Sequence, residues 1–281
     1  MNTYPAAPTE LTVRRLSVDL SQGFSRHWNG GDAFLTAYAN ALSMSFPVGE
    51  QFFIDSLRRA QKELTPDQQS AFAPELKGFI GQEATHRRLH QLFNQHLENQ
   101  GMVNHWAPRA LKRIAKVEHM NVRHAVAATA STEHFTAVLA QWLLSNPAFL
   151  AQAEPRLQTL WHWHASEESE HRCTAFDMYK ALNGNEEWRL QWMRLTTWYL
   201  LTDLLRQTVN NLWHDGSLFK LSTWRSAWVF LLAKEGLFRS SYAMWRRYFR
   251  PDFHPQQDDD SLSKAWLQNH ENAYARVGST T

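Results

Sequence analysis

The chain has few of the residues that join disulfides or interrupt helices. Its 281 residues include one cysteine, Cys173, together with 11 glycines and 10 prolines. A single cysteine excludes an internal disulfide, which agrees with a reducing compartment. The glycines and prolines fall mostly between long periodic segments, and strand-like alternation bounded by turn residues is hard to find. The sequence therefore predicts an all-α protein.

Long apolar runs and a strong net charge are also missing. No run of about 18 uninterrupted apolar residues occurs, so a membrane-spanning helix is not expected. The start of the chain has no apolar core of the signal-peptide type. The net charge is +2, so charge alone predicts no nucleic-acid partner. We expect a cytoplasmic protein.

Turn and capping residues divide the chain into predicted helices. Thr65-Pro66-Asp67-Gln68 has the pattern of a capping box with proline at the first helical position, and Pro47 is expected to bend the preceding helix. Helices are expected at about 32–64, 66–100, 108–146, 155–183, 186–214 and 222–249. The predicted units are a leader (1–30), a four-helix bundle (31–184), accessory aromatic-rich helices (185–255) and a tail (256–281) whose Asp258-Asp259-Asp260 reads as a solvated linker.

The stretch WHWHASEESEH, residues 161–171, concentrates potential metal ligands. On a helix, His164, Glu168 and His171 occupy positions 0, +4 and +7 and share one face. His162 and Glu170 lie well off that face. Glu167 lies near its edge, which leaves Glu167 as the alternative to Glu168 as a ligand.

Three other predicted helices supply matching residues. Glu168-x-x-His171 is the Glu-x-x-His motif of four-helix di-iron proteins, and Glu83-x-x-His86 repeats it. Glu50 precedes Glu83 by 33 residues, and Glu133 precedes Glu168 by 35. Two helical hairpins would therefore bring four carboxylates and two imidazoles around two cations, and buried carboxylates in such a number need counter-ions.

Further histidines and carboxylates lie near this set in the sequence. His164 has no counterpart in the second helix, where Phe79 stands at the equivalent position. We expect His164 to be a further ligand; the alternative is that it hydrogen-bonds a carboxylate. His90 is expected to be packed or hydrogen-bonded, Glu118 to be a weaker candidate than Glu133, Cys173 to pack in the core, and His254 to cap a turn.

The set carries a resemblance to known families. The ligand pattern resembles the di-iron site of p-aminobenzoate N-oxygenases. More closely, FPVGEQFF, GQEATH, EHFTA, WHWHASEESEH and PDFHP are similar to the bacterial family of predicted metal-dependent hydrolases, over about residues 30–255. That resemblance implies a ferritin-like fold and a metal site at Glu50, Glu83, His86, Glu133, His164, Glu168 and His171.

Tryptophan is unevenly distributed, with ten of thirteen residues from Trp161 onward. The segment 188–250 interleaves tryptophan, leucine and arginine. It reads as helices lining an apolar substrate channel, as a surface in peripheral contact with a membrane, or as ordinary core with solvated arginines.

These observations lead to three functional hypotheses. The first is an O₂-dependent oxidase or oxygenase with two iron ions, acting on a small apolar or aromatic substrate with an unidentified electron donor. The second is a metal-dependent hydrolase with zinc or manganese, in which the two cations activate a bridging water. The third is a non-enzymatic metal-binding or membrane-associated protein.

Overall fold

The computed structural model describes residues 11–277, so parts of the expected leader (1–10) and tail (278–281) lie outside the described residues. The prediction of an all-α protein is confirmed, with one small two-stranded sheet beside the helices. The main helices are α1 (Ala33–Gln61), α2 (Pro66–Asn99), α3 (Trp106–Glu118), α4 (Val122–Ser145), α5 (Pro155–Glu170), α6 (Thr174–Ala181), α7 (Glu186–His214), α8 (Leu221–Leu232), α9 (Leu237–Arg247) and α10 (Ser261–Asn269).

The first two helices form as their capping residues predict. The Asp32 side chain accepts a hydrogen bond from the backbone N–H of Leu35 and starts α1, which continues through Pro47 without a break. Thr65 and Gln68 form the expected capping box at the start of α2. Gly101 follows the end of α2 with φ +84°, a conformation that favours glycine.

Three segments expected as single helices are each divided in two. The segment 108–146 breaks at residues 119–121, where the Asn121 side chain caps α4 by accepting from the N–H of Arg123. The segment 155–183 breaks after His171, where the buried Arg172 turns to donate to the carbonyl oxygen of Pro255 at 3.1 Å. The segment 222–249 breaks at residues 233–236, before α9.

The tail is not a solvated linker, and this prediction was wrong. Asp258 is buried and lies 2.7 Å from a guanidinium nitrogen of Arg247. Beyond it, α10 packs on α5, and strand β2 (Tyr274–Arg276) pairs antiparallel with β1 (Arg14–Leu16). The two ends of the described chain therefore meet beside α5.

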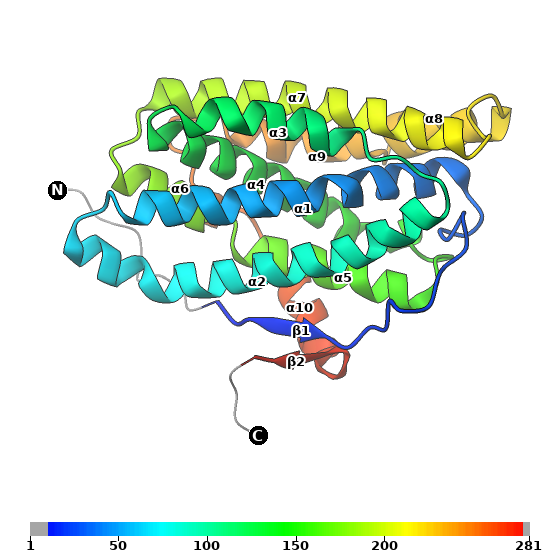
Figure 1. Cartoon of the computed structure of the whole chain (residues 1–281), viewed down its shortest axis with the longest axis horizontal. Helices are drawn as coiled ribbons and strands as arrows, with labels where there is room; N and C mark the ends of the chain where they lie inside the picture. The colour runs from blue at the N-terminus through cyan, green and yellow to red at the C-terminus, as the bar shows by residue number, and fades with distance from the viewer. Residues whose placement is uncertain (1–10, 278–281) are drawn as a thin grey trace.

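The helices are arranged in layers (Figure 1). In the centre, α1 packs against α2 and α4, and α4 packs against α5. A layer containing α7, α8 and α9 covers α1 and α4 on one side, and β1, β2 and α10 lie on the opposite side of the molecule. Within residues 11–277, no helix combines the length and the apolar character needed to cross a bilayer.

The segment at Leu11 packs closely against α2 at Gly78, and this contact predicts how substitutions change stability. A Cβ at Gly78 would lie 2.4 Å from the carbonyl oxygen of Leu11, whereas a Cβ at Gly49 would have the Phe53 ring as its nearest neighbour, at 3.8 Å. Gly78→Ala should therefore lower the free energy of unfolding by about 1–3 kcal/mol, as overpacking does. Gly49→Ala, also mid-helix, should leave stability equal or higher. Urea denaturation compares them, and equal midpoints would contradict the close contact.

Candidate metal centre

The seven predicted site residues meet inside the molecule. Glu50 comes from α1, Glu83 and His86 from α2, Glu133 from α4, and His164, Glu168 and His171 from α5 and its C-terminal cap. Each is at most 3% exposed. Spacings of three, four and seven residues keep the side chains of each helix on its inner face.

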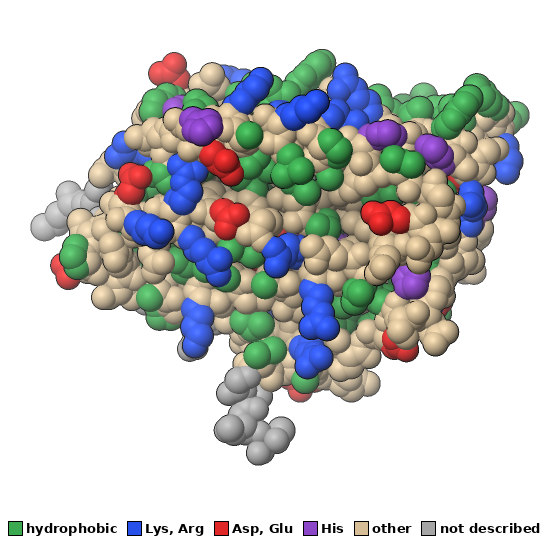
Figure 2. Space-filling model, viewed as in Figure 1, with side chains coloured by type: hydrophobic (Ala, Val, Ile, Leu, Met, Phe, Trp, Pro, Cys, Tyr) green, Lys and Arg blue, Asp and Glu red, His purple; other side chains and the backbone are tan. Residues whose placement is uncertain are grey.

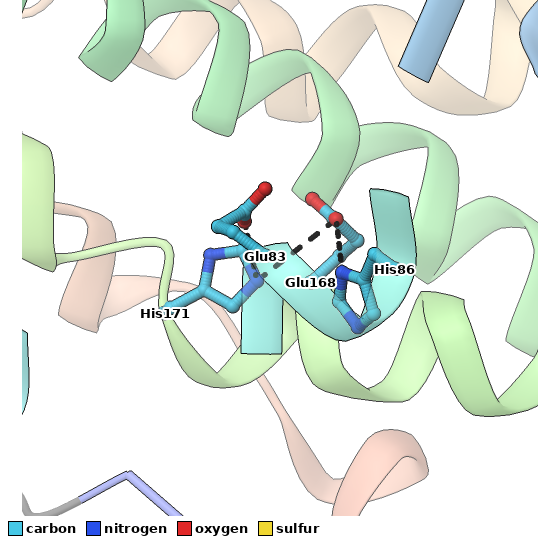
Figure 3. Close-up of side chains that lie close together, drawn as sticks. All are labelled: Glu83, His86, Glu168 and His171. Carbon is cyan, nitrogen blue, oxygen red and sulfur yellow. Dashed lines mark ion pairs between the residues drawn. The ribbon is translucent and has the colours of Figure 1, made fainter. Parts of the chain in front are cut away.

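One group surrounds Glu168, and Figure 3 shows its members pointing toward one another from α2 and α5. The Oε1 atom of Glu168 lies 3.4 Å from Nδ1 of His86 and 3.9 Å from Nε2 of His171. The same Nε2 lies 3.3 Å from Oε1 of Glu83. Two carboxylates and two imidazoles thus converge on a space that one cation can occupy.

A second group joins the first at His86. Ligand atoms of Glu50, His86 and His164 lie within 4.8 Å of one another. Glu133 belongs to neither group, but its Oε2 lies 2.8 Å from Nδ1 of His171. The arrangement therefore offers two adjacent cation positions, with Glu133 beside the first.

The inner atoms of this cluster have no hydrogen-bond partners among the described residues. They are both oxygens of Glu50, both oxygens of Glu83, Nδ1 of His86, Oε1 of Glu133, Oε2 of Glu168 and Nε2 of His171. A buried polar atom without a partner typically destabilises a fold by about 1–3 kcal/mol, and more when charged. Oxygen and imidazole nitrogen donors suit iron, manganese or zinc, so the residues fit a pair of divalent cations.

Burial dominates the electrostatics of these carboxylates. It raises the pKa values of Glu50 and Glu83 well above the ordinary range, and neighbouring glutamates raise that of Glu83 further. Burial also raises the pKa of Glu133 to about 7, against the opposing effect of His171. The cluster has more carboxylate than the protein's own positive groups can stabilise in ionised form.

Glu167 lies outside the centre and hydrogen-bonds the ring nitrogen of His86 that points away from Glu168. The Nε2 atom of His86 lies 2.9 Å from Oε2 of Glu167, whose other oxygen accepts from Arg14 at 3.0 Å. Because Glu167 accepts the Nε2 proton, a neutral His86 keeps its lone pair on Nδ1, toward Glu168. Of the two neighbouring glutamates, Glu168 is the one that lies in the cluster.

A second chain of hydrogen bonds sets the proton on His164. Asn94 donates from Nδ2 to the backbone oxygen of Ser43 (2.9 Å), so its Oδ1 accepts the Ser43 hydroxyl proton (2.7 Å). The Ser43 oxygen must then accept from Nδ1 of His90 (2.9 Å), and Nε2 of a neutral His90 accepts from Nδ1 of His164 (2.7 Å). A neutral His164 therefore presents a bare Nε2 lone pair.

That lone pair meets a carboxylate. Burial, with the nearby His86, lowers the pKa of His164 to about 4, so the ring is neutral near pH 7. Burial opposes ionisation of Glu168, but His171 and His86 outweigh it and hold the pKa of Glu168 well below the ordinary range. The Nε2 of His164 and Oε1 of Glu168 lie 2.9 Å apart. Two lone pairs at this distance repel, unless a cation lies beside both.

Several other sequence predictions have clear outcomes. His90 is buried and hydrogen-bonded, as expected. His254 caps its turn by accepting from the N–H of Gln256, which confirms that prediction. Glu118 is an exposed residue at the end of α3, away from the cluster. Arg14 was missed, because nothing in the leader marks a partner 153 positions away.

An apolar cavity of about 440 Å³ leads to the cluster from between α1, α3, α4 and α7. Of the seven cluster residues, Glu50 and Glu168 line it. Most of its other lining is hydrophobic and includes Phe46, Phe53, Trp106, Leu139 and Leu200. A small molecule could therefore approach these two carboxylates through apolar surroundings.

The fold and the buried cluster define an all-α, metal-dependent protein. A model of the family described as predicted metal-dependent hydrolase matches residues 12–259, and the chain belongs to this family. The resemblance of the sequence motifs to this family is thus confirmed. A search of curated proteins and a search of solved structures found no significant match.

The contact between Glu167 and His86 predicts an effect on metal affinity. Glu167→Gln should weaken binding of Zn²⁺ or Fe²⁺ about 10–100-fold, because the ring loses the acceptor that orients it. The number of ions bound at saturation should not change. Glu170→Gln is the matched control, since Glu170 also contacts Arg14 but contacts no histidine of the cluster. Isothermal titration measures both variants, and equal affinities would contradict the assigned role.

Proposed function

We propose that the protein is an enzyme that uses two divalent cations, held in a ferritin-like frame of α1, α2, α4 and α5 within residues 31–184. The observation that carries this proposal is the set of buried nitrogen and oxygen atoms on the inner side of the cluster that make no hydrogen bond to the described residues. Seven residues from four elements present nitrogen and oxygen donors to the same space. This donor count suits two cations better than one.

The proposed ligands divide between two positions. Glu83, Glu168 and His171 would hold one cation, and Glu133 would approach it beside His171. Glu50 and His164 would hold the other, and His86 lies next to both positions. The chain of hydrogen bonds from Asn94 through Ser43 and His90 supports the role of His164 as a ligand. It leaves Nε2 of a neutral His164 without a proton, which is the form of imidazole that binds metal.

Hydrolysis is the first candidate reaction, and the family description supports it. Two bound cations would supply a water of lowered pKa and would polarise an ester or phosphate oxygen. The chain itself would position the substrate in the apolar cavity, so that the susceptible bond faces Glu50 and Glu168. With one oxygen of Glu50 bound to a cation, its other oxygen would be able to accept the proton of an attacking water.

Oxidation with O₂ is a second candidate, and the donor set favours it. Four carboxylates with three imidazoles resemble the ligand sets of di-iron proteins more than those of zinc enzymes. The apolar cavity lining would suit a hydrophobic or aromatic substrate and would exclude water from the reacting atoms.

Metal content tests the cation site directly. Elemental analysis of freshly purified protein should find two metal ions per chain, and anomalous scattering should place them among the seven residues. Glu168→Ala should lose at least one of the two ions, because Glu168 lies close to His86, His164 and His171. Glu187→Ala, an exposed residue at the start of α7, is the control and should keep both. Unchanged stoichiometry in Glu168→Ala would shift the ligand role to Glu167.

Metal identity and reactivity separate the two reactions. A hydrolase should contain zinc or manganese and should cleave apolar esters or phosphate esters without consuming O₂. An oxidase should contain iron, and its reduced form should take up O₂ and show a transient near-ultraviolet or visible band. Substituting Leu139→Trp, which narrows the cavity, should lower the rate of whichever reaction occurs. The absence of both activities with every one of these metals would contradict an enzymatic role.

A further inference from the structure

The accessory helices expose an unusual amount of hydrophobic surface. Residues 11–277 contain 19 large hydrophobic side chains that are exposed to solvent, and 13 of these lie between Trp198 and Tyr242. We call these 13 residues the aromatic face. They are Trp198, Tyr199, Leu201, Leu205, Trp213, Phe219, Leu221, Trp224, Trp228, Val229, Leu232, Phe238 and Tyr242.

The aromatic face follows helical spacing. Trp198, Leu201 and Leu205 lie on one side of α7, and Leu221, Trp224 and Trp228 repeat the pattern on α8. Figure 2 shows hydrophobic side chains along the upper edge of the molecule, above α7 and α8, with lysine and arginine side chains among them. Exposed apolar surface of this extent marks an interaction site.

The charges within the same stretch have one prevailing sign. Its exposed basic side chains are Arg206, Lys220, Arg225, Lys234, Arg239 and Arg246. None of them takes part in the ion pairs of the described residues, in which the neighbouring acids Asp203 and Asp215 pair with other elements. Glu235 is the exposed acidic residue among residues 198–246. A second copy docked by two-fold symmetry would bring like charges together, whereas an anionic lipid surface would complement them.

An apolar pocket opens on the aromatic face. Its volume is about 610 Å³, and Leu201, Leu205, Trp224, Phe238 and Tyr242 all line it. These five residues are also exposed, so the pocket is accessible from the face itself. Such a pocket has the size and polarity to take a lipid acyl chain.

We propose that the aromatic face docks on a lipid bilayer that carries anionic headgroups. The tryptophans and leucines enter the interface between headgroups and acyl chains, and the surrounding arginines and lysines contact lipid phosphates and carboxylates. The pocket then faces the acyl chains. This proposal does not depend on the reaction at the metal centre.

Co-sedimentation of the full chain with lipid vesicles tests the proposal. The protein should bind phosphatidylcholine vesicles that contain about 30 mol% phosphatidylserine, and should bind pure phosphatidylcholine more weakly. The double variant Trp224→Ser/Trp228→Ser should reduce partitioning onto the mixed vesicles at least about tenfold. Leu111→Ser, an equally exposed position on α3, is the control and should bind as the wild type does.

A second pair of variants separates charge from apolar contact. Arg225→Gln/Arg239→Gln should reduce binding to the anionic vesicles about tenfold and should leave binding to pure phosphatidylcholine unchanged. Unaltered thermal unfolding and metal content would show that each variant is folded. Glu168→Ala should bind vesicles as the wild type does, so a failure at the metal centre would not affect this test.

Two results would overturn the proposal. One is absence of binding to either vesicle by the wild type. The other is a wild-type dimer that Trp224→Ser/Trp228→Ser converts to a monomer without any change in vesicle binding, because the face would then join two copies of the chain.

Discussion

The interior of the protein holds more carboxylate oxygens and imidazole nitrogens than its own hydrogen-bond donors can satisfy. Four glutamates and three histidines enter the interior, and each histidine has a hydrogen-bond partner that orients it: Glu167 for His86, Glu133 for His171 and His90 for His164. The remaining nitrogen and oxygen atoms face inward without hydrogen bonds to the described residues, although some lie at ion-pair distance from one another. Unpaired carboxylates in an apolar interior are strongly destabilising. Bound cations would give partners to the inner atoms that no described residue hydrogen-bonds.

The helical content and the register of the cluster could be predicted because both depend on local spacing. A period of 3.6 residues places Glu83 with His86, and Glu168 with His164, whatever the surrounding chain does. The breaks within helices were harder, because each depends on a local competitor for backbone hydrogen bonds. Asn121 caps a new helix in mid-segment, and Arg172 binds carbonyl groups more than 80 positions away. Neither the cap at Asn121 nor the distant partners of Arg172 are visible in a periodic pattern.

The choice between Glu167 and Glu168 illustrates the same limit. The two side chains are about 100° apart around α5, and spacing alone leaves one at the centre of the ligand face and the other at its edge. What separates their roles is Arg14, which comes from a segment read as irregular and which anchors Glu167 behind His86. The roles of Ser43 and Asn94 have a similar origin, because their contacts join α1 to α2 across the interior.

Cavities lie between the buried centre and the exposed layer of helices, and they share lining residues. Leu139 lines the cavity at Glu50 and Glu168, a small pocket beside His164, and the pocket beneath the aromatic face. Tyr38 lines the last two, and burial raises the pKa of its hydroxyl above the ordinary range, so the phenol stays neutral. A substrate on this side of the cluster would meet apolar walls until it reached the two carboxylates. Shape and apolar contact would therefore select the substrate, while the cations and their carboxylates would decide which of its bonds reacts.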